Sequence, residues 1–251
     1  MRSKMGRQFL WKCFRHGGKG RFLHFRTNLL SNPLYVVDNM SFLWQFHDIF
    51  VKEVYRFKSD VEDPVIIDCG SNIGLSVIYF KKLYPKAKII AFEADPNIYQ
   101  IQLENLKRFE NIELKNKAIW IDNKGVQMHP NQADGGYVSQ EGKVHVKSER
   151  LKDVLNNQKK IDLLKLDVEG AEFDLIEDCR EHLSIVKKLF VEIHTFQREK
   201  QKVSRLIEVI EKAGFRYFIE NANDQKSPLF NDWKTGDTGM DMQLNLYAIR
   251  E

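Results

Sequence analysis

The 251-residue sequence lacks the features that mark several classes of protein. It has only three cysteines, Cys13, Cys69 and Cys179, which lie far apart and form neither a CxxC pair nor a zinc-binding spacing. No apolar run approaches the roughly 18–20 residues that span a bilayer. The basic N-terminus also lacks the unbroken apolar segment of a signal peptide. These absences exclude a disulfide scaffold and predict a soluble protein of a reducing, cytoplasmic compartment.

The composition is that of an ordinary globular protein. Hydrophobic residues make up 43% of the chain and charged residues 29%, which excludes disorder and a collagen-like structure. There is no internal repeat and no low-complexity tract. The length allows one α/β domain with added segments or two small domains. One domain with an N-terminal extension is the expected organisation.

Acidic residues are absent from residues 1–37, although eight basic residues lie there. The rest of the chain holds 31 basic and 35 acidic residues, so the pattern predicts an acidic body with a cationic arm rather than a nucleic-acid binder. The body also has no aromatic sheet pattern of an RNA-binding domain. The arm instead suggests a peripheral contact of residues 1–26 with acidic membrane lipids.

Two parts are expected along the chain. Residues 1–60 form a basic and aromatic extension. It is expected to contain two short helices separated by Gly17, Gly18 and Gly20 and a third helix over 42–57, and these helices are expected to cover the domain that follows. In residues 61–251, short apolar runs alternate with amphipathic stretches, which predicts βαβ units. The expected fold is a Rossmann-like, seven-stranded, mostly parallel sheet with a last antiparallel strand and helices on both faces. The strands are predicted at Val65–Cys69, Lys88–Phe92, Ile112–Leu114 running on toward Trp120, Ile161–Leu166, Lys188–Ile193, Phe215–Glu220 and Gln243–Ile249.

Helix ends and two interruptions complete this prediction. Asp95 and Pro96 are typical of a helix start, and Gly214 of a helix end. Residues 121–148 predict an inserted hairpin and residues 221–242 a polar loop. Both are expected at the carboxyl ends of strands, where open parallel sheets bind ligands.

The first predicted strand runs into a glycine-punctuated turn and a helix. Gly70 and Gly74 let the backbone approach a ligand closely, and the helix start offers free N–H groups. A dinucleotide fingerprint needs glycine where this chain has Asn72 and Leu75, so a nicotinamide-dependent oxidoreductase is disfavoured. Asp68 at the end of this strand suits a ligand with an ammonium group. Turn glycines in a sheet that binds nothing are the alternative.

Three segments together resemble class I S-adenosylmethionine-dependent methyltransferases and, within them, the FkbM family. They are the turn after Asp68, the step Phe92-Glu93-Ala94-Asp95-Pro96, and Leu164-Lys165-Leu166-Asp167-Val168-Glu169-Gly170-Ala171-Glu172, within a resemblance that covers about residues 40–250. The resemblance implies S-adenosylmethionine as cofactor and O-methylation of a hydroxyl on a sugar, glycan or glycosylated natural product. It implies that the cofactor is bound by Asp68, Gly70, Ser71, Asn72, Gly74, Glu93 at the ribose, and Ala94 and Ala118 near the adenine.

Catalytic candidates lie at the ends of the fourth and fifth predicted strands. Asp167, Glu169, Glu192 and His194 are expected to converge beside the cofactor. In-line methyl transfer needs an aligned acceptor, and an alcohol benefits from a base. His194 is the main candidate for that base because its ordinary pKa is near neutrality, with Glu192 on the same strand face to orient it. A structural histidine at a strand end is the alternative for His194, as a helix cap is for Glu169.

Other interpretations stay open. Carboxylates and a histidine at 167, 169 and 194 allow a Mg²⁺ site, but the resemblance does not require a metal and none is predicted. Trp44, Tyr55 and Phe57 form either a lid or part of the core, and Trp233 either stacks on a sugar or anchors its loop. A catalytically silent binding or scaffolding protein, docked through the basic arm, is the competing function.

Overall fold

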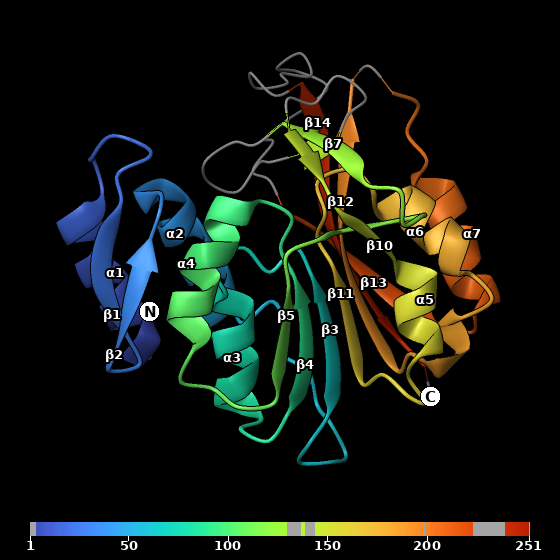
Figure 1. Cartoon of the computed structure of the whole chain (residues 1–251), viewed down its shortest axis with the longest axis horizontal. Coiled ribbons are helices and arrows are strands. Elements are labelled where there is room, and N and C mark those ends of the chain that lie inside the picture. Colours follow the sequence, from blue (N-terminus) through green and yellow to red (C-terminus); the bar gives the residue numbers. More distant parts are fainter. Residues whose placement is uncertain (1–3, 130–136, 139–143, 198, 223–238, 251) are drawn as a thin grey trace.

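The computed structural model describes residues 4–129, 137–138, 144–197, 199–222 and 239–250 (Figure 1). Most of the predicted polar loop, including Trp233, and the predicted turn at 134–136 lie outside these residues. Among the helices that are described, none is both long and apolar enough to cross a membrane.

A seven-stranded sheet forms the centre of the molecule and confirms the predicted fold class. All strands are parallel except β14, which is antiparallel to both of its neighbours. Nearly every residue of the central strands β3 and β11 is buried, as expected of parallel strands covered on both faces. In spatial order the strands are β13 (Arg216–Asn221), β14 (Met240–Ile249), β12 (Lys188–Phe196), β11 (Leu163–Leu166), β3 (Val65–Cys69), β4 (Lys88–Phe92) and β5 (Ile112–Lys115).

Helices cover the two faces of this sheet and enclose two apolar cores (Figure 1). On one face lie α3 (Leu75–Leu83) and α4 (Pro96–Leu106), and on the other α5 (Leu151–Asn156), α6 (Glu172–Cys179) and α7 (Val203–Lys212), with the 3₁₀ turn η2 (Leu183–Ile185) before β12. The Asp95 side chain accepts hydrogen bonds from the first backbone N–H groups of α4, which confirms the predicted helix start. Gly214 follows α7 with a positive φ, as predicted.

The N-terminal part packs beside α3 and α4. It contains α1 (Lys4–His16), the antiparallel hairpin β1 (Phe25–Leu29) and β2 (Asn32–Val36), α2 (Asn39–Phe46) and the π-helix η1 (His47–Lys52). Asn105 of α4 ties β2 to the body, because its side chain accepts from the Tyr35 N–H at 2.7 Å and donates to the Tyr35 carbonyl at 3.0 Å.

One predicted helix in this region was wrong, and another was predicted with the wrong ends. The chain after the glycines forms a hairpin, because Leu30 and Ser31 both adopt positive φ and make the two-residue turn that twisted strands favour. The predicted 42–57 helix starts earlier and ends by Glu53, whose left-handed backbone stops it.

The third predicted strand was also wrong in its extent. β5 ends at Lys115, because the Asn116 side chain donates to the carbonyls of Glu93 and Ala94 and turns the chain away. The next strand, β6 (Ala118–Trp120), pairs in parallel with β10 (Ser148–Arg150) outside the main sheet. Between them, β7 (Val126–His129) pairs with β8 (Tyr137–Val138) and β9 (Val144–Val146). The predicted strand 161–166 begins only at Leu163, and Ile161 makes an isolated bridge.

Candidate active site

A cavity of about 960 Å³ opens where the strand order reverses. The chain builds β3, β4 and β5 outward in one direction, and β11 then pairs with the other side of β3. Open parallel sheets bind ligands at such a switch point, beyond the carboxyl ends of the strands. Two sides of the cavity differ in chemistry. The glycine wall consists of Gly70, Ser71, Asn72, Glu93, Ala94 and Ala118, and the carboxylate wall of Asp167, Glu169, Glu192, Trp44, Gln243 and Asn245.

Gly70 sets the distance between β3 and β11 at the glycine wall. Its φ is +83°, and an added Cβ would lie 1.8 Å from the backbone oxygen of Asp167. The Gly70 and Ser71 N–H groups donate to the Phe92 carbonyl at 3.1 and 2.9 Å. Only glycine allows this close approach of the two strand ends.

Glu93 is the charged group of the glycine wall. Its two carboxyl oxygens accept from the backbone N–H groups of Asn72, at 2.9 Å, and Asp95, at 2.8 Å. Burial raises the pKa of Glu93 to about 7, against the lowering effect of these two donors. The carboxylate therefore lies in the cavity wall with lone pairs available to hydroxyl donors.

Two residues predicted at the cofactor do not line the cavity. Asp68 is fully buried behind the wall, where Ser76 Oγ donates to it at 2.5 Å. Gly74 faces α4, since an added Cβ would come 3.0 Å from the Leu106 side chain. The glycine-rich spacing therefore serves helix packing at Gly74 and strand contact at Gly70.

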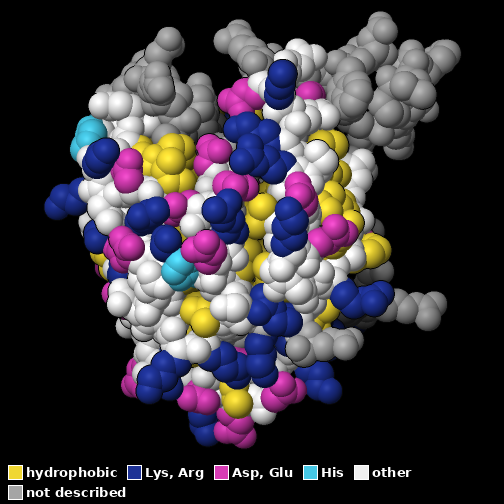
Figure 2. All heavy atoms as spheres, turned by 90° about the vertical axis from the view of Figure 1, so that its right-hand side faces the viewer, with side chains coloured by type: hydrophobic (Ala, Val, Ile, Leu, Met, Phe, Trp, Pro, Cys, Tyr) yellow, Lys and Arg dark blue, Asp and Glu magenta, His cyan; other side chains and the backbone are white. Residues whose placement is uncertain are grey.

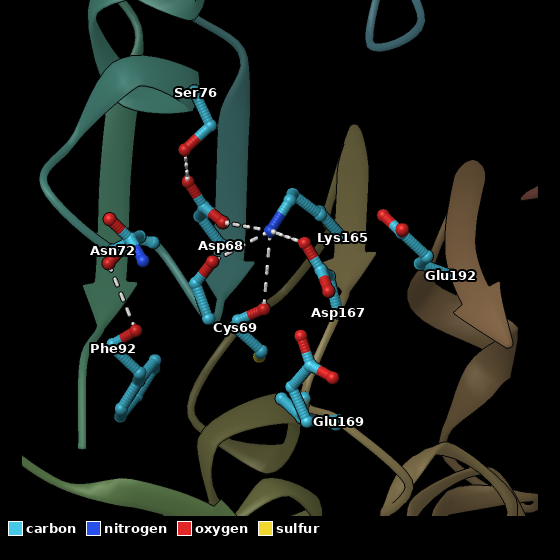
Figure 3. Close-up of polar contacts among 12 residues, drawn as sticks. Asp68, Cys69, Asn72, Ser76, Phe92, Lys165, Asp167, Glu169 and Glu192 are labelled. Atoms are coloured by element: carbon cyan, nitrogen blue, oxygen red, sulfur yellow. Dashed lines mark hydrogen bonds and ion pairs between the residues drawn. The ribbon is translucent and has the colours of Figure 1, made fainter. Parts of the chain in front are cut away.

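The Lys165 ammonium lies between Asp68 and Asp167 and so joins the two walls (Figure 3). Its Nζ lies 3.1 Å from Asp68 Oδ1 and 3.3 Å from Asp167 Oδ2, and it donates to the Gly70 carbonyl at 2.9 Å. Burial disfavours the ammonium, but Asp68 and Asp167 outweigh it and raise the pKa of Lys165 above its ordinary value. The sequence pattern gave Lys165 no role. A lysine within the apolar strand 163–166 was the signal that could have found it.

His194 lies behind the carboxylate wall, 2% exposed. Its Nδ1 lies 3.0 Å from Glu172 Oε1, and its Nε2 lies 3.8 Å from oxygens of both Glu169 and Glu192. Burial disfavours the imidazolium, but the Glu172 and Glu169 carboxylates outweigh it and raise the pKa of His194 well above its ordinary value. The raised pKa favours the cationic form of His194 over the neutral form that a base needs. Glu172, not Glu192, makes its hydrogen bond.

Glu169 and Glu192 are the two carboxyl groups of the carboxylate wall whose pKa values are raised. Burial, with further repulsion from Asp167, raises the pKa of Glu169 to about 8 despite His194, and that of Glu192 to about 7. Glu169 also has a φ of +55°, a strained backbone for a non-glycine residue. Figure 3 shows the carboxyl groups of Asp167, Glu169 and Glu192 turned toward a common space. Glu169 and Glu192 can exchange protons near neutral pH.

The same cluster has ligand-type atoms at metal-binding spacing. Within the described ranges, one atom each of Asp167, Glu192 and His194 lies within 4.8 Å of the other two. A divalent cation bound there would need His194 in its neutral form, because a metal and a proton compete for the same ring nitrogen.

The remainder of the carboxylate wall comes from distant segments. Trp44 is 62% exposed and reaches the cavity from α2. Asn245 on β14 pairs in register with Glu192 and Glu220, and its buried Oδ1 has no hydrogen-bond partner. Tyr55 lines the cavity while packed in the core, whereas Phe57 packs on Phe80 and Tyr84 instead. The positions of these residues in the sequence do not predict that they line one wall.

Comparison with known proteins gives several relatives. The chain is 28% identical to "Methyltransferase sdnD" of Sordaria araneosa over 69% of this chain and 83% of that protein. It is 30% identical to "2-O-methyltransferase NoeI" of Sinorhizobium fredii over 52% and 63%, respectively. It is 27% identical to "Hexuronic acid methyltransferase AglP" of Haloferax volcanii over 64% and 70%.

A solved structure shares the fold. The FkbM methyltransferase of Methylobacillus flagellatus KT superposes with a TM-score of 0.51 at 14% identity, covering 79% of this chain and 46% of that one. The model of the methyltransferase FkbM domain matches residues 68–217, a range that contains the glycine wall and the carboxyl groups at 167, 169 and 192. The chain therefore belongs to the FkbM methyltransferase family and is an S-adenosylmethionine-dependent methyltransferase.

Proposed function

We propose that this enzyme O-methylates a hydroxyl of a sugar, glycan or glycosylated natural product, with Glu169 as the base. The observation that carries the proposal is the Glu169 carboxyl group, which reaches the cavity with a pKa raised to about 8 and a cationic histidine behind it. A hydroxyl must give up its proton when it attacks the methyl group, so it needs a proton acceptor. A site that only aligned the acceptor would not need one.

The glycine wall fits the cofactor. Glu93 offers carboxylate lone pairs to ribose hydroxyls, and Ala94 and Ala118 leave a smooth apolar surface for the adenine. Bound S-adenosylmethionine supplies a methyl group on a positively charged sulfur. Asp167, held by Lys165 next to Gly70, gives the cavity a negative charge that attracts such a cation. Asp68 acts through Lys165 as a positioning residue.

Proton transfer falls to the chain's own groups. Glu169 accepts the proton of the acceptor hydroxyl, and the buried imidazolium of His194 holds the Glu169 carboxylate in place. Glu172 fixes that imidazolium through Nδ1 and also accepts the N–H of Gly170. Both contacts fix the position of Glu169 before the acceptor arrives, and positioning lowers the barrier for an in-line displacement.

The carboxylate wall supports a sugar acceptor. Trp44 offers an aromatic face, and the unpartnered Oδ1 of Asn245 needs a donor such as a hydroxyl. The described residues that line the cavity include eight carboxylates and four cationic side chains. A neutral or amino sugar suits this negative cavity better than a carboxylated sugar, although the AglP relative is named for hexuronic acid.

An acceptor panel with methyl-labelled S-adenosylmethionine tests the proposal. Neutral, amino and carboxylated glycosides of one hexose are compared, and the labelled carbon is located by NMR. We expect transfer to an oxygen of the neutral or amino glycoside. Transfer to nitrogen or carbon would contradict O-methylation. Cofactor binding with no transfer to any of these glycosides would contradict the sugar proposal and favour the silent binding protein.

A further inference from the structure

Helix α1 exposes a compact apolar surface. Leu10, Trp11 and Phe14 are 49%, 54% and 90% exposed, and they lie on one side of the helix at spacings of one, three and four residues. Phe22 and Leu23, just beyond the helix, are 44% and 48% exposed. Single exposed apolar residues are common, but five within 14 residues of chain are more than isolated cases.

The opposite side of α1 is fixed to the protein. Met5, Phe9 and Cys13 pack against the core, and the Lys12 ammonium donates to Thr27 and to the Asn28 carbonyl. The helix is therefore a rigid part of the fold, and its apolar side has no partner among the described residues.

The segment that carries this surface has only basic charged residues. Residues 1–37 contain no acidic residue, and the exposed cations include Lys4, Arg7, Arg15 and Lys19. Arg15 lies over the Trp11 ring at 5.2 Å, so cation and aromatic group form one surface. Figure 2 shows the face over α5 to α7, where Lys and Arg are interspersed with Asp and Glu. The α1 surface lacks that mixture.

We propose that α1 and residues 22–23 dock on the surface of an anionic lipid bilayer. Aromatic and aliphatic side chains on one side, with Lys and Arg beside them, are the composition of interfacial helices. The aliphatic and phenyl groups enter the acyl boundary, and the cations contact lipid phosphates. Nucleic acid would use the cations but leave Leu10, Phe14 and Leu23 in water.

Docking in this way places the cavity near the bilayer. One side of α2 faces α1, where the Lys12 ammonium lies 5.2 Å from the Phe42 ring and 5.6 Å from the Phe46 ring. Another side carries Trp44 and Gln45 into the cavity lining. The cavity is thus one helix away from the membrane-facing surface.

Vesicle sedimentation of the full chain tests the proposal. We expect binding to phosphatidylserine-containing vesicles and little binding to phosphatidylcholine vesicles. Phe14→Ser and the pair Arg7→Glu with Arg15→Glu should each weaken binding about tenfold or more. Phe218→Ser is the matched apolar control, since Phe218 is 63% exposed on β13. Arg205→Glu with Lys212→Glu on α7 is the control of equal charge change.

Three outcomes would overturn the proposal. One is equal binding by Phe14→Ser and the parent protein. Another is tighter binding to double-stranded RNA than to anionic vesicles at the same salt concentration. The third is a concentration-dependent dimer that Phe14→Ser abolishes, because the surface would then bind a second copy. Calorimetry with S-adenosylmethionine on every variant separates these results from a failure of the methyltransferase site.

Discussion

The glycine wall and the carboxylate wall face the same cavity but arise from the sequence in different ways. The glycine wall comes mostly from two strand ends and the turns after them, at residues 70–72 and 93–94. The carboxylate wall collects side chains from residue 44 to residue 245. In the proposed mechanism, binding of the methyl donor S-adenosylmethionine therefore depends on local motifs. Acceptor choice and proton transfer depend instead on side chains brought together from distant parts of the chain.

Replacing Glu169 by Gln should have the largest effect. We expect kcat to fall by about 10²–10⁴-fold, because the amide cannot accept a proton. The dissociation constant of S-adenosylmethionine should stay nearly the same. Single-turnover kinetics measures the first quantity and calorimetry the second. Glu220→Gln, on the same side of the cavity but in contact with Tyr247, should change KM more than kcat. An equal loss of kcat in both variants would show that total negative charge matters, not Glu169.

Lys165→Met should destabilise the fold. The change leaves Asp68 buried beside Asp167 without a cation, and breaking a buried pair in this way costs about 3–5 kcal/mol of unfolding free energy. Urea denaturation measures this difference. Adding Asp68→Asn to Lys165→Met should recover part of it. As a control, Lys88→Met breaks an exposed pair with Asp63 and should change stability little. A fully stable Lys165→Met variant would remove Lys165 as the link between the walls.

Gly70→Ala should disrupt the glycine wall, and Gly214→Ala provides a matched control. Both glycines have φ near +83°, but an added Cβ at Gly214 meets nothing within 4 Å. Gly214→Ala should therefore cost only the left-handed strain of about 1–2 kcal/mol. Gly70→Ala adds a clash with the Asp167 backbone, so cofactor affinity should fall sharply. Equal affinities in the two variants would contradict the close approach of β3 and β11.

The pH profile should follow Glu169. Its pKa is raised to about 8, so the carboxyl group is protonated and inactive below that pH. We expect kcat to rise with pH through about 8 and to level off above it, with a lower inflection near 7 from Glu192. The pKa of His194 is raised well above its ordinary value, so His194 should give no inflection near that ordinary value. A rise in kcat centred near the ordinary histidine pKa would return the base role to His194.

Removing metal ions should have the smallest effect. The His194 imidazolium supplies positive charge to the carboxylate wall, so dialysis against EDTA should leave kcat unchanged. Loss of activity that Mg²⁺ restores would instead assign Asp167, Glu192 and His194 as metal ligands.

Sequence patterns predicted the sheet, its antiparallel last strand and most strand positions, because apolar runs and capping residues are local signals. They also identified Glu93 and Gly70. They missed the β1–β2 hairpin, whose turn uses Leu30 and Ser31 rather than glycine or asparagine. The charge of His194 was not predicted either. It depends on the carboxylates of Glu169, which follows β11, of Glu172, which begins α6, and of Glu192 on its own strand.

Calorimetric titration of S-adenosylmethionine into Glu93→Ala and Glu169→Gln tests the division between the walls most directly. Glu93→Ala removes the charged hydrogen-bond acceptor of the glycine wall. Cofactor affinity should therefore fall by about 10–100-fold, the effect expected when hydrogen bonds to a charged group are lost. Glu169→Gln should bind the cofactor as tightly as the parent protein while losing turnover. Unchanged affinity in Glu93→Ala, or lost affinity in Glu169→Gln, would contradict the assignment of donor binding to one wall and proton transfer to the other.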